Sequence, residues 1–534
     1  MKNYTLFFAL ILFNALSAQT PITSGPDWTV TNITGNSALD RPNTMLFGPD
    51  NYLWITERQG KVVSKVDPTT GTKTEMLNLS SKVYQSKSQN GLMGMTIHPD
   101  LYANINTNTN NYVYLLYTYD ANSGSGVDDR FRIERYNYDA STGKLDSASA
   151  FTVIEGIEAS TDHTSGKIVI GADLKIYWTI GDFAANRGGN ACNEIRSQYL
   201  PTSPTDYSDY KGKIFRLNLD GSIPDDNPVL EGVKSYVYAY GFRNAQGLVV
   251  GSNGKIYSSE HGDKTDDELN IIESGKNYGW PLIAGYNDDM GYAYCNWSNY
   301  PSECGSYSNI IADCPESPIE ESTSAANMPN FMPPIGTYNS TLATEPTAGS
   351  SSGWPTVAPS SIDIYEAGKI PGWDTSLLIP TLKAGIIFRT KLNSDGSALE
   401  DGSYEEFHSS GDRFRDVAID ANGLIIYTIT DAGAVIKLEF VGEPLSTSTV
   451  LKNTLSLYPN PANTKTTISL GTSFKGDVNL LQVFDVNGKV IKSIKTSEKQ
   501  YILDTSNFTN GIYFLKVSNN KNTVLATKKL VVKH

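Results

Sequence analysis

The chain has 534 residues, more than one ordinary hydrophobic core holds, so two or more domains are expected. Its formal net charge of -14 and its pI of about 4.9 argue against nucleic acid or an anionic membrane as the main partner. Abundant tyrosine and glycine, with only 19% charged residues, indicate a strand-rich extracellular protein with many turns.

The N-terminus predicts a secretory signal peptide over residues 1–18. Lys2 gives a basic start, an almost wholly apolar run follows from Leu6 to Leu16, and small residues at 17 and 18 offer a cleavage point. The run is too short for a stable membrane span, and no other stretch approaches the ~20 apolar residues that a span needs. We therefore expect an exported protein with no membrane span.

One motif recurs along the body of the chain: a Gly/Asp/Asn turn, an apolar-aromatic strand and a closing polar or acidic residue. The clear copies are residues 48–58, 171–182, 251–263 and 420–433, with weaker copies at 110–120 and 373–392. Such recurrent hairpins predict an all-β fold, a six-bladed β-propeller over residues 26–440. A large β-sandwich array is the alternative. In a propeller, residues far apart in sequence meet at one mouth of the central channel.

Four cysteines are expected to pair after export. They are Cys192, Cys295, Cys304 and Cys314, without an accompanying histidine or CxxC spacing. One or two disulfides are therefore expected rather than a metal site, and three full pairings are open.

The composition shifts near Val441. Residues 441–453 are small and polar, as in a linker, and residues 454–534 carry strand candidates and more lysines than acids. We expect this tail to be a small β-sandwich without catalysis of its own.

His163, one of only five histidines, is the first candidate for proton chemistry. Asp162 precedes it, and Asp182 ends the strand pair that follows. A carboxylate at one ring nitrogen fixes the tautomer and makes the other nitrogen a better base. A structural histidine that caps a turn is the alternative.

Arg243 and Asn244 stand together in an apolar stretch. An adjacent cation and amide suit an oxygen that develops negative charge. The alternative is a surface arginine in a turn.

Arg413 and Arg415 are two residues apart and would share one face of a strand. Together with Lys383 they suit a multiply charged anionic ligand. Ion pairs with Asp412 and Asp416 on a solvated face are the alternative.

Two acidic segments, residues 260–270 and 277–294, are candidates for a hard cation such as calcium, which takes carboxylates and backbone carbonyls from loops. Neither matches the EF-hand pattern. A third acidic stretch, residues 218–228, predicts a hairpin turn instead.

Seven segments together resemble the soluble quinoprotein glucose/sorbosone dehydrogenase family, in order from about Asp40 to Leu438. They are TDHTSGKIVIG, YKGKIFRLNLDGSIPDDNP, YGFRNAQGL, NYGWPLIAGYNDDMGYAY, GWPTVAPSS, IPTLKAGIIFRTKL and DRFRDV. The resemblance implies a six-bladed propeller that binds pyrroloquinoline quinone and calcium and oxidises aldose sugars at the anomeric carbon to lactones. An external electron acceptor is then needed to reoxidise the cofactor.

The resemblance also implies roles for individual residues. His163 is expected to be the general base, Asp182 its orienting carboxylate, and Arg243 the cation at the quinone oxygen, while Gln89 and Asp162 contact the sugar. The expected cofactor-binding residues are Arg243, Asn244, Trp354, Thr356, Lys383, Arg413 and Arg415. The expected calcium ligands are the backbone carbonyls of Gly262 and Asp263, with further structural ligands at Glu268, Tyr278, Ala284 and Asp288.

The chain departs from the family pattern in places. His261 and Asp263 stand where the family usually has Gln and Pro, and the segment before Trp354 lacks the family's cysteine. The residues between Cys295 and Pro333 align poorly, and because these loops border the pocket, the preferred sugar does not carry over.

Within the tail, residues 455–470, 483–494 and 508–517 resemble the C-terminal sorting domain read by the type IX secretion system. This implies that the secretion machinery is a partner and that the protein is secreted or displayed at the cell surface. Whether the chain forms a homodimer is open.

Two rival functions remain on the sequence. A calcium-dependent lactonase on a similar propeller would need a carboxylate-ringed metal at the channel centre and would have no use for the cations at 383, 413 and 415. A propeller that binds glycan without turnover would lack the environment of His163.

Overall fold

The computed structural model describes residues 20–289, 292–321, 328–338, 354–443, 455–470, 479–518 and 524–534. The expected signal peptide and residues 444–453 of the expected linker lie outside the described residues. The chain divides into two compact units, Met1–Pro444 and Leu445–His534. Among the described residues, no helix has the length and apolar character that crossing a membrane requires.

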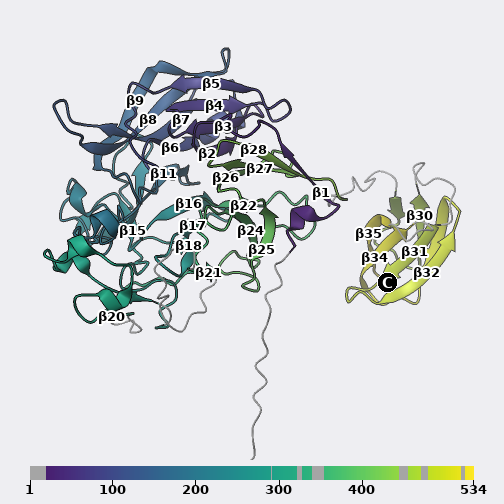
Figure 1. The fold of residues 1–534 in the computed structure, drawn as a ribbon. Coiled ribbons are helices and arrows are strands. Elements are labelled where there is room, and N and C mark those ends of the chain that lie inside the picture. The colour runs from purple at the N-terminus through teal and green to yellow at the C-terminus, as the bar shows by residue number, and fades with distance from the viewer. Residues whose placement is uncertain are drawn as a thin grey trace, which may run out of the picture. The chain divides into compact units, whose positions relative to one another are not determined.

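The first unit is built from four-stranded antiparallel sheets, six of which are formed by its described residues (Figure 1). The first three contain β2 (Pro42–Phe47), β3 (Leu53–Glu57), β4 (Val62–Val66) and β5 (Lys73–Asn78); β6 (Leu92–Ile97), β7 (Tyr112–Asp120), β8 (Asp129–Asp139) and β9 (Lys144–Glu158); and β10 (Ile168–Ile170), β11 (Lys175–Ile180), β12 (Lys213–Asn218) and β15 (Val237–Tyr240). The next three contain β16 (Ala245–Val250), β17 (Ile256–Glu260), β18 (Asp267–Ile272) and β21 (Gly336–Tyr338); β22 (Asp363–Tyr365), β23 (Ser376–Pro380), β24 (Ile386–Lys391) and β25 (Glu405–Ser409); and β26 (Phe414–Ile419), β27 (Ile425–Thr430), β28 (Val435–Phe440) and β1 (Trp28–Asn32).

Short elements decorate the connections between these strands. They are α1 (Pro99–Ala103), the pairs β13 (Val229–Leu230) with β14 (Val233–Lys234) and β19 (Ala293–Tyr294) with β20 (Ile319–Glu320), and the 3-10 turns Ile22–Ser24, Gly188–Asn190, Tyr207–Asp209, Trp297–Asn299, Cys304–Ser306 and Ile311–Asp313.

The sheets close into a ring around an axial channel. The strands β2, β6, β10, β16, β22 and β26 contact one another in that order, and β26 returns to β2. Residues from all six line one cavity along the axis. The expected all-β propeller is thereby confirmed, with each sheet as a blade.

The recurring motif occupies the same place in four blades. Each clear copy spans the turn after the inner strand and then the second strand, β3, β11, β17 or β27. Because the second strand runs antiparallel to the inner one, it ends at the mouth where the inner strand begins. The closing polar residues of the motif therefore gather at one mouth of the channel.

The N-terminal strand completes the last blade. β1 pairs with β28, with Trp28 opposite Phe440 and Asn32 opposite Ile436. A strand from the N-terminal end of the propeller thus becomes the outer strand of a sheet made by the C-terminal end, and this pairing holds the two ends of the propeller together.

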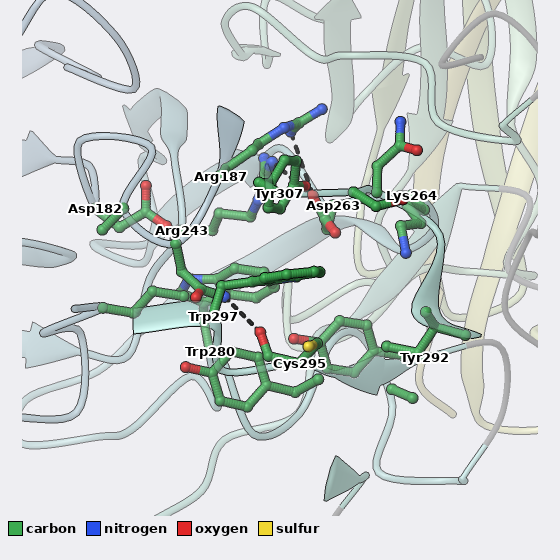
Figure 2. A pocket seen from close by; sticks show the side chains of 18 of the residues that line it. Asp182, Arg187, Arg243, Asp263, Lys264, Trp280, Tyr292, Cys295, Trp297 and Tyr307 are labelled. Carbon is green, nitrogen blue, oxygen red and sulfur yellow. Dashed lines mark hydrogen bonds and ion pairs between the residues drawn. The ribbon is translucent and has the colours of Figure 1, made fainter. Parts of the chain in front are cut away.

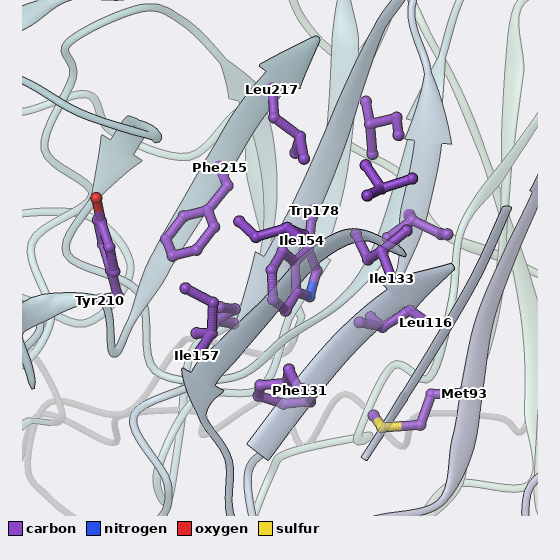
Figure 3. Close-up of a cluster of buried hydrophobic side chains, with 14 of the residues drawn as sticks. Met93, Leu116, Phe131, Ile133, Ile154, Ile157, Trp178, Tyr210, Phe215 and Leu217 are labelled. Carbon is purple, nitrogen blue, oxygen red and sulfur yellow. The ribbon is translucent and has the colours of Figure 1, made fainter. Parts of the chain in front are cut away.

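Neighbouring blades pack through large apolar side chains. Between the second and third blades, Phe131 meets Trp178 edge to face at 5.3 Å, and within the third blade Trp178 meets Phe215 at 5.1 Å (Figure 3). All three are fully buried. Burial of such rings, each stabilising by about 1.5–3 kcal/mol, makes the scaffold rigid enough to hold a site on its loops.

The second unit is all β. One sheet contains β29 (Leu455–Tyr458), β30 (Lys465–Leu470) and β33 (Gln500–Asp504), and the other contains β31 (Asn479–Phe484), β32 (Val490–Thr496), β34 (Gly511–Ser518) and β35 (Val524–Val532). Both sheets contribute to one core, in which Ile468, Leu503 and Leu515 are fully buried. This is the two-sheet packing expected for the tail.

Candidate active site

His163 lies in the connection between β9 and β10, at the mouth where the motif's closing residues gather. Its φ of 45° is in the left-handed region, and its backbone N–H donates to Gln89 Oε1 at 3.0 Å and Asp162 Oδ1 at 2.9 Å. Only glycine fits at 181, because a Cβ there would lie 1.9 Å from the His163 carbonyl oxygen. The two expected sugar-contacting residues, which also bond to each other, therefore hold the His163 backbone.

A hydrogen-bonded chain runs from His163 through Asp182 to Trp280. His163 Nδ1 lies 2.7 Å from Asp182 Oδ1, and the Trp280 indole donates to Asp182 Oδ2 at 2.9 Å. Because the carboxylate accepts, Nδ1 carries the ring proton and Nε2 keeps a lone pair. Burial lowers the pKa of His163, and Arg243 lowers it further against the opposing effect of Asp182. A lowered pKa favours the neutral form of the ring, which a base requires.

Arg243 and Asn244 form the connection between β15 and β16. The buried carboxylate of Glu260 accepts the backbone N–H groups of both residues. The Arg243 guanidinium donates to Asp263 Oδ1 at 3.1 Å, and Arg187 lies 3.3 Å from the same oxygen. Burial alone would raise the pKa of Asp263, but Arg187 and Arg243 hold it below its usual value. Arg243 is therefore a buried cation with a defined orientation.

The structure brings Lys383 together with Trp354 and Thr356. Its Nζ donates to the Trp354 carbonyl oxygen at 2.6 Å and to Thr356 Oγ1 at 2.9 Å. The Arg187 guanidinium lies 5.8 Å from the centre of the Trp354 ring, so these three residues border the group around Arg243.

Arg413 and Arg415 belong to a cluster of four arginines around Asp431. Arg415 and Arg41 lie 2.8 and 3.2 Å from its carboxylate oxygens, and Arg58 and Arg413 lie 3.6 and 3.7 Å away. Burial, followed by repulsion from Arg415, lowers the pKa of Arg58 to about 9. The buried Nε atoms of Arg58 and Arg415 have no hydrogen-bond partner. One carboxylate does not balance four cations, so the cluster suits an anionic ligand.

The expected alternative for these arginines, pairing with Asp412 and Asp416, is wrong. Asp416 accepts Lys167 Nζ at 2.8 Å instead. The strand begins only at Phe414, and its register shifts between Phe414 and Asp416. The regular alternation of side chains between the two strand faces therefore fails at Arg415. Arg413 and Arg415 lie together because both contact Asp431, not because they share a strand face.

His261 lies beside Asn244, within electrostatic reach of both Arg243 and Arg415. Its Nε2 lies 2.8 Å from the Pro359 carbonyl oxygen, and its Nδ1 lies 3.5 Å from Asn244 Nδ2. Burial holds the pKa of His261 well below its usual value, and Arg243, His163 and Arg415 depress it further. His163, Arg243 and Arg415, which the sequence places far apart, thus lie in one region of the structure.

The expected calcium segments form a buried acidic region. Glu268 Oε1 accepts the Gly285 N–H at 2.7 Å, and Glu321, which the sequence analysis missed, accepts the Ala284 N–H at 3.0 Å. Burial raises the pKa of Glu268, and it raises the pKa of Asp266 to about 8. Within the described residues, no three His, Cys, Asp or Glu side chains are arranged as a metal site.

A pocket of about 500 Å³, its open mouth included, lies at this end of the channel (Figure 2). Its lining includes His163, Asp182, Arg187, Arg243, Asp263 and Trp280. The lining also includes Tyr292, Trp297 and Tyr307, from a segment that two disulfides hold. The disulfides join Cys192 to Cys304 and Cys295 to Cys314, which selects one of the three pairings.

The family model of glucose/sorbosone dehydrogenases matches residues 39–300 and 335–437. The chain is 39% identical over 424 residues to quinoprotein glucose dehydrogenase B of Acinetobacter calcoaceticus, covering 75% of this chain and 85% of that protein. The chain belongs to the glucose/sorbosone dehydrogenase family. An aldose sugar dehydrogenase of Escherichia coli is 24% identical over 408 residues, covering 75% of this chain and 90% of that protein.

Solved structures of similar fold include the PQQ-bound aldose sugar dehydrogenase of Streptomyces coelicolor, with a TM-score of 0.53 and 24% identity over 77% of this chain and 98% of that one. The apo aldose sugar dehydrogenase of Escherichia coli has a TM-score of 0.55 and 23% identity over 77% of this chain and 99% of that one. At 23–24% identity, the similarity to these structures shows a shared fold and no more. Residues 456–533 match the model of a secretion system C-terminal sorting domain, which supports secretion or cell-surface display.

The sequence analysis missed Arg41, Arg58 and Asp431. Arg58 directly follows the second strand β3, and Asp431 directly follows the second strand β27. Asp182 and Glu260 occupy the corresponding positions at the end of β11 and β17. The closing residue of the recurring motif was the signal that could have found two of them.

Proposed function

We propose that this chain is a secreted quinoprotein that oxidises aldose sugars at C1 to lactones. The observation that carries the proposal is the His163 ring, whose Nδ1 lies 2.7 Å from Asp182 Oδ1 in a pocket that it shares with Arg243. The 39% identity to a quinoprotein glucose dehydrogenase supports the same class of reaction.

The cationic residues fit pyrroloquinoline quinone, whose carboxylates call for positive partners. Lys383, Arg413 and Arg415 would hold these carboxylates, and the unpaired Nε of Arg415 is a buried donor suited to one of them. Asn244, Trp354 and Thr356 would line the same site. When bound, this cofactor supplies the two-electron oxidant that accepts the C1 hydride.

His163 would take the proton of the anomeric hydroxyl at Nε2 as the C1–H bond breaks, which leaves the C1–O bond as the lactone carbonyl. Asp182 would stabilise the imidazolium that forms, because its carboxylate already accepts from Nδ1. Arg243 would stabilise negative charge that develops beside it. Gln89 and Asp162 would contact the sugar while they hold the His163 backbone.

Calcium is the second cofactor that we propose. The carbonyls of Gly262 and Asp263 would hold one ion, and Glu268, Tyr278, Ala284 and Asp288 would hold structural calcium. The donor chemistry fits, since buried carboxylates with raised pKa values repel one another and would be stabilised by a hard cation.

Removing calcium from the apo-protein with a chelator is expected to lower its melting temperature by about 2–5 °C, because a ligand that binds only the folded state stabilises it. Differential scanning calorimetry before and after chelation checks this. Calcium should restore the melting temperature at concentrations where magnesium, which prefers octahedral geometry, does not. An unchanged melting temperature after chelation contradicts the structural calcium.

Reconstitution tests the function itself. The full chain mixed with pyrroloquinoline quinone and calcium is expected to reduce a dye when an aldose is added, and the product should be the lactone. Absence of dye reduction with every sugar of a broad aldose panel would contradict the proposed dehydrogenase activity. Sugar binding without reduction would favour a glycan-binding propeller. An external electron acceptor takes the place of the dye in the organism.

The lactonase alternative lacks support at the channel centre. Among the carboxylates that line the channel cavity, Asp416 is bound by Lys167 at 2.8 Å and by the backbone N–H of Met45 at 2.8 Å. It is therefore compensated and is not a bare ligand for a central metal. For export, we propose that the type IX secretion machinery recognises the second unit.

A further inference from the structure

One wall of the pocket that contains His163, residues 292–314, runs from the matched part of the chain into a part that the family model leaves out. The match stops at residue 300 and resumes at residue 335, yet Tyr307 and Ile311 line the pocket. Tyr307 therefore belongs to the part of the wall that lies outside the matched family pattern.

The wall is covalently tied to the catalytic loop. Cys192 lies in the loop that follows Asp182, and its disulfide to Cys304 joins that loop to the wall. A second disulfide, between Cys295 and Cys314, closes the wall segment on itself. Cross-links of this kind restrict the conformations open to a loop, so the wall has a defined position relative to Asp182.

Hydrogen bonds and packing hold the same arrangement. Asn186, also in the catalytic loop, donates to the Cys295 carbonyl oxygen at 2.7 Å and accepts the Ser298 N–H at 3.2 Å. Trp297 meets Tyr307 edge to face at 5.6 Å and is itself buried. Trp297 therefore supports the Tyr307 ring from within the wall.

The wall places Tyr307 against the charged groups of the site. Figure 2 shows its ring beside Arg187 and Asp263, with Arg243 next to them. The ring is half-buried, and burial followed by the charge of Asp263 raises the pKa of its hydroxyl. Tyr307 thus presents both an aromatic face and a neutral hydroxyl to whatever enters the pocket.

A pyranose ring matches this surface, because its C–H faces pack on aromatic rings and its hydroxyls take polar partners. Tyr307, Trp297 and Ile311 line the same side of the pocket, so a second sugar ring that extends toward the wall would meet these side chains. We propose that Tyr307 is a specificity-determining residue that closes the sugar pocket, admitting single-ring aldoses and excluding reducing disaccharides. This rests on the proposed function and names the substrate class of the same site.

The test compares the reconstituted full chain with its Tyr307→Ala variant on glucose and galactose against maltose, cellobiose and lactose. The wild type is expected to favour the monosaccharides in kcat/KM. Tyr307→Ala should lower that preference by about 10-fold or more by admitting the second ring. The Tyr307→Ala variant without cofactor should also bind the disaccharides more tightly than the wild type does, as measured by titration calorimetry. This measurement does not depend on the cofactor.

Two matched variants sharpen the result. Tyr307→Phe keeps the ring and should retain the preference, and Tyr300→Ala, in the same wall but outside the pocket lining, should leave it unchanged. Tyr307→Leu replaces the alanine variant if the latter does not fold. Equal kcat/KM for both sugar classes in the wild type, or an unchanged preference in the folded variant, overturns this inference alone. Absence of oxidation with every aldose overturns the proposed function.

Discussion

Replacing His163 with alanine is expected to lower kcat for aldose oxidation by about 10²-fold or more, in line with the loss of a general base. The variant removes the imidazole that Asp182 orients, while the cations at 383, 413 and 415 are untouched. Pyrroloquinoline quinone should therefore still bind. Steady-state dye reduction measures the loss, and quenching of protein fluorescence on titration with the quinone measures binding.

A second buried histidine serves as the control. His98 lies outside the pocket and caps α1, where its Nδ1 accepts the Asp100 N–H at 3.1 Å. Asparagine can make the same cap, so His98→Asn should keep full activity. If His163→Ala retains wild-type turnover, the base lies elsewhere.

The pH profile of the wild type gives an independent reading of His163. Burial and Arg243 lower its pKa, so the neutral form persists to more acidic pH than for a free histidine. The acid limb of kcat/KM should accordingly have its midpoint below 6.5, the usual histidine value. A midpoint above that value contradicts His163 as the titrating base. Loss of this limb in an Asp182→Asn variant, which cannot orient the ring in the same way, would connect the limb to the pair.

Lys383→Ala is expected to weaken pyrroloquinoline quinone binding by about 10- to 100-fold, because charge-assisted hydrogen bonds are the stronger class. The lysine already lies in hydrogen-bond contact with Trp354 and Thr356, so its ammonium is positioned for a carboxylate without reordering. The dissociation constant of the apo-protein for the quinone checks this without any assay of turnover.

The matched control is Lys369→Ala, which removes an equal charge from an exposed position outside the site. It should leave the dissociation constant unchanged, whereas a general electrostatic effect would weaken binding in both variants. If Lys383→Ala binds the quinone as tightly as the wild type, Lys383 is not a cofactor contact.

Local sequence was enough to predict the class of fold. Turn residues followed by β-branched and aromatic residues specify hairpins within a dozen residues, and four clear copies of the motif occupy the same position in four blades. The same locality explains why His163 and Asp182 were predicted together, since a single hairpin of the third blade separates them.

Partners contributed by distant blades could not be predicted in this way. Asp431 forms ion pairs with Arg41 and Arg58 only because the ring brings the last blade beside the first. Trp280 reaches Asp182 across 98 residues of sequence. The register shift at Arg415 also broke the alternation that had suggested a shared strand face.

The sequence by itself therefore determined the hairpins, the number and identity of the cysteines, and the pairing of His163, the proposed base, with nearby carboxylates, because each depends on residues close in the chain. Only the tertiary structure decided which cysteines pair, which arginines share Asp431, and that residues 292–314 form a wall of the pocket. The packing of the blades into a ring decides the arginine cluster and the Cys192–Cys304 bond. It brings the ends of antiparallel strands from all blades to one mouth, and no local pattern records which distant residues meet there.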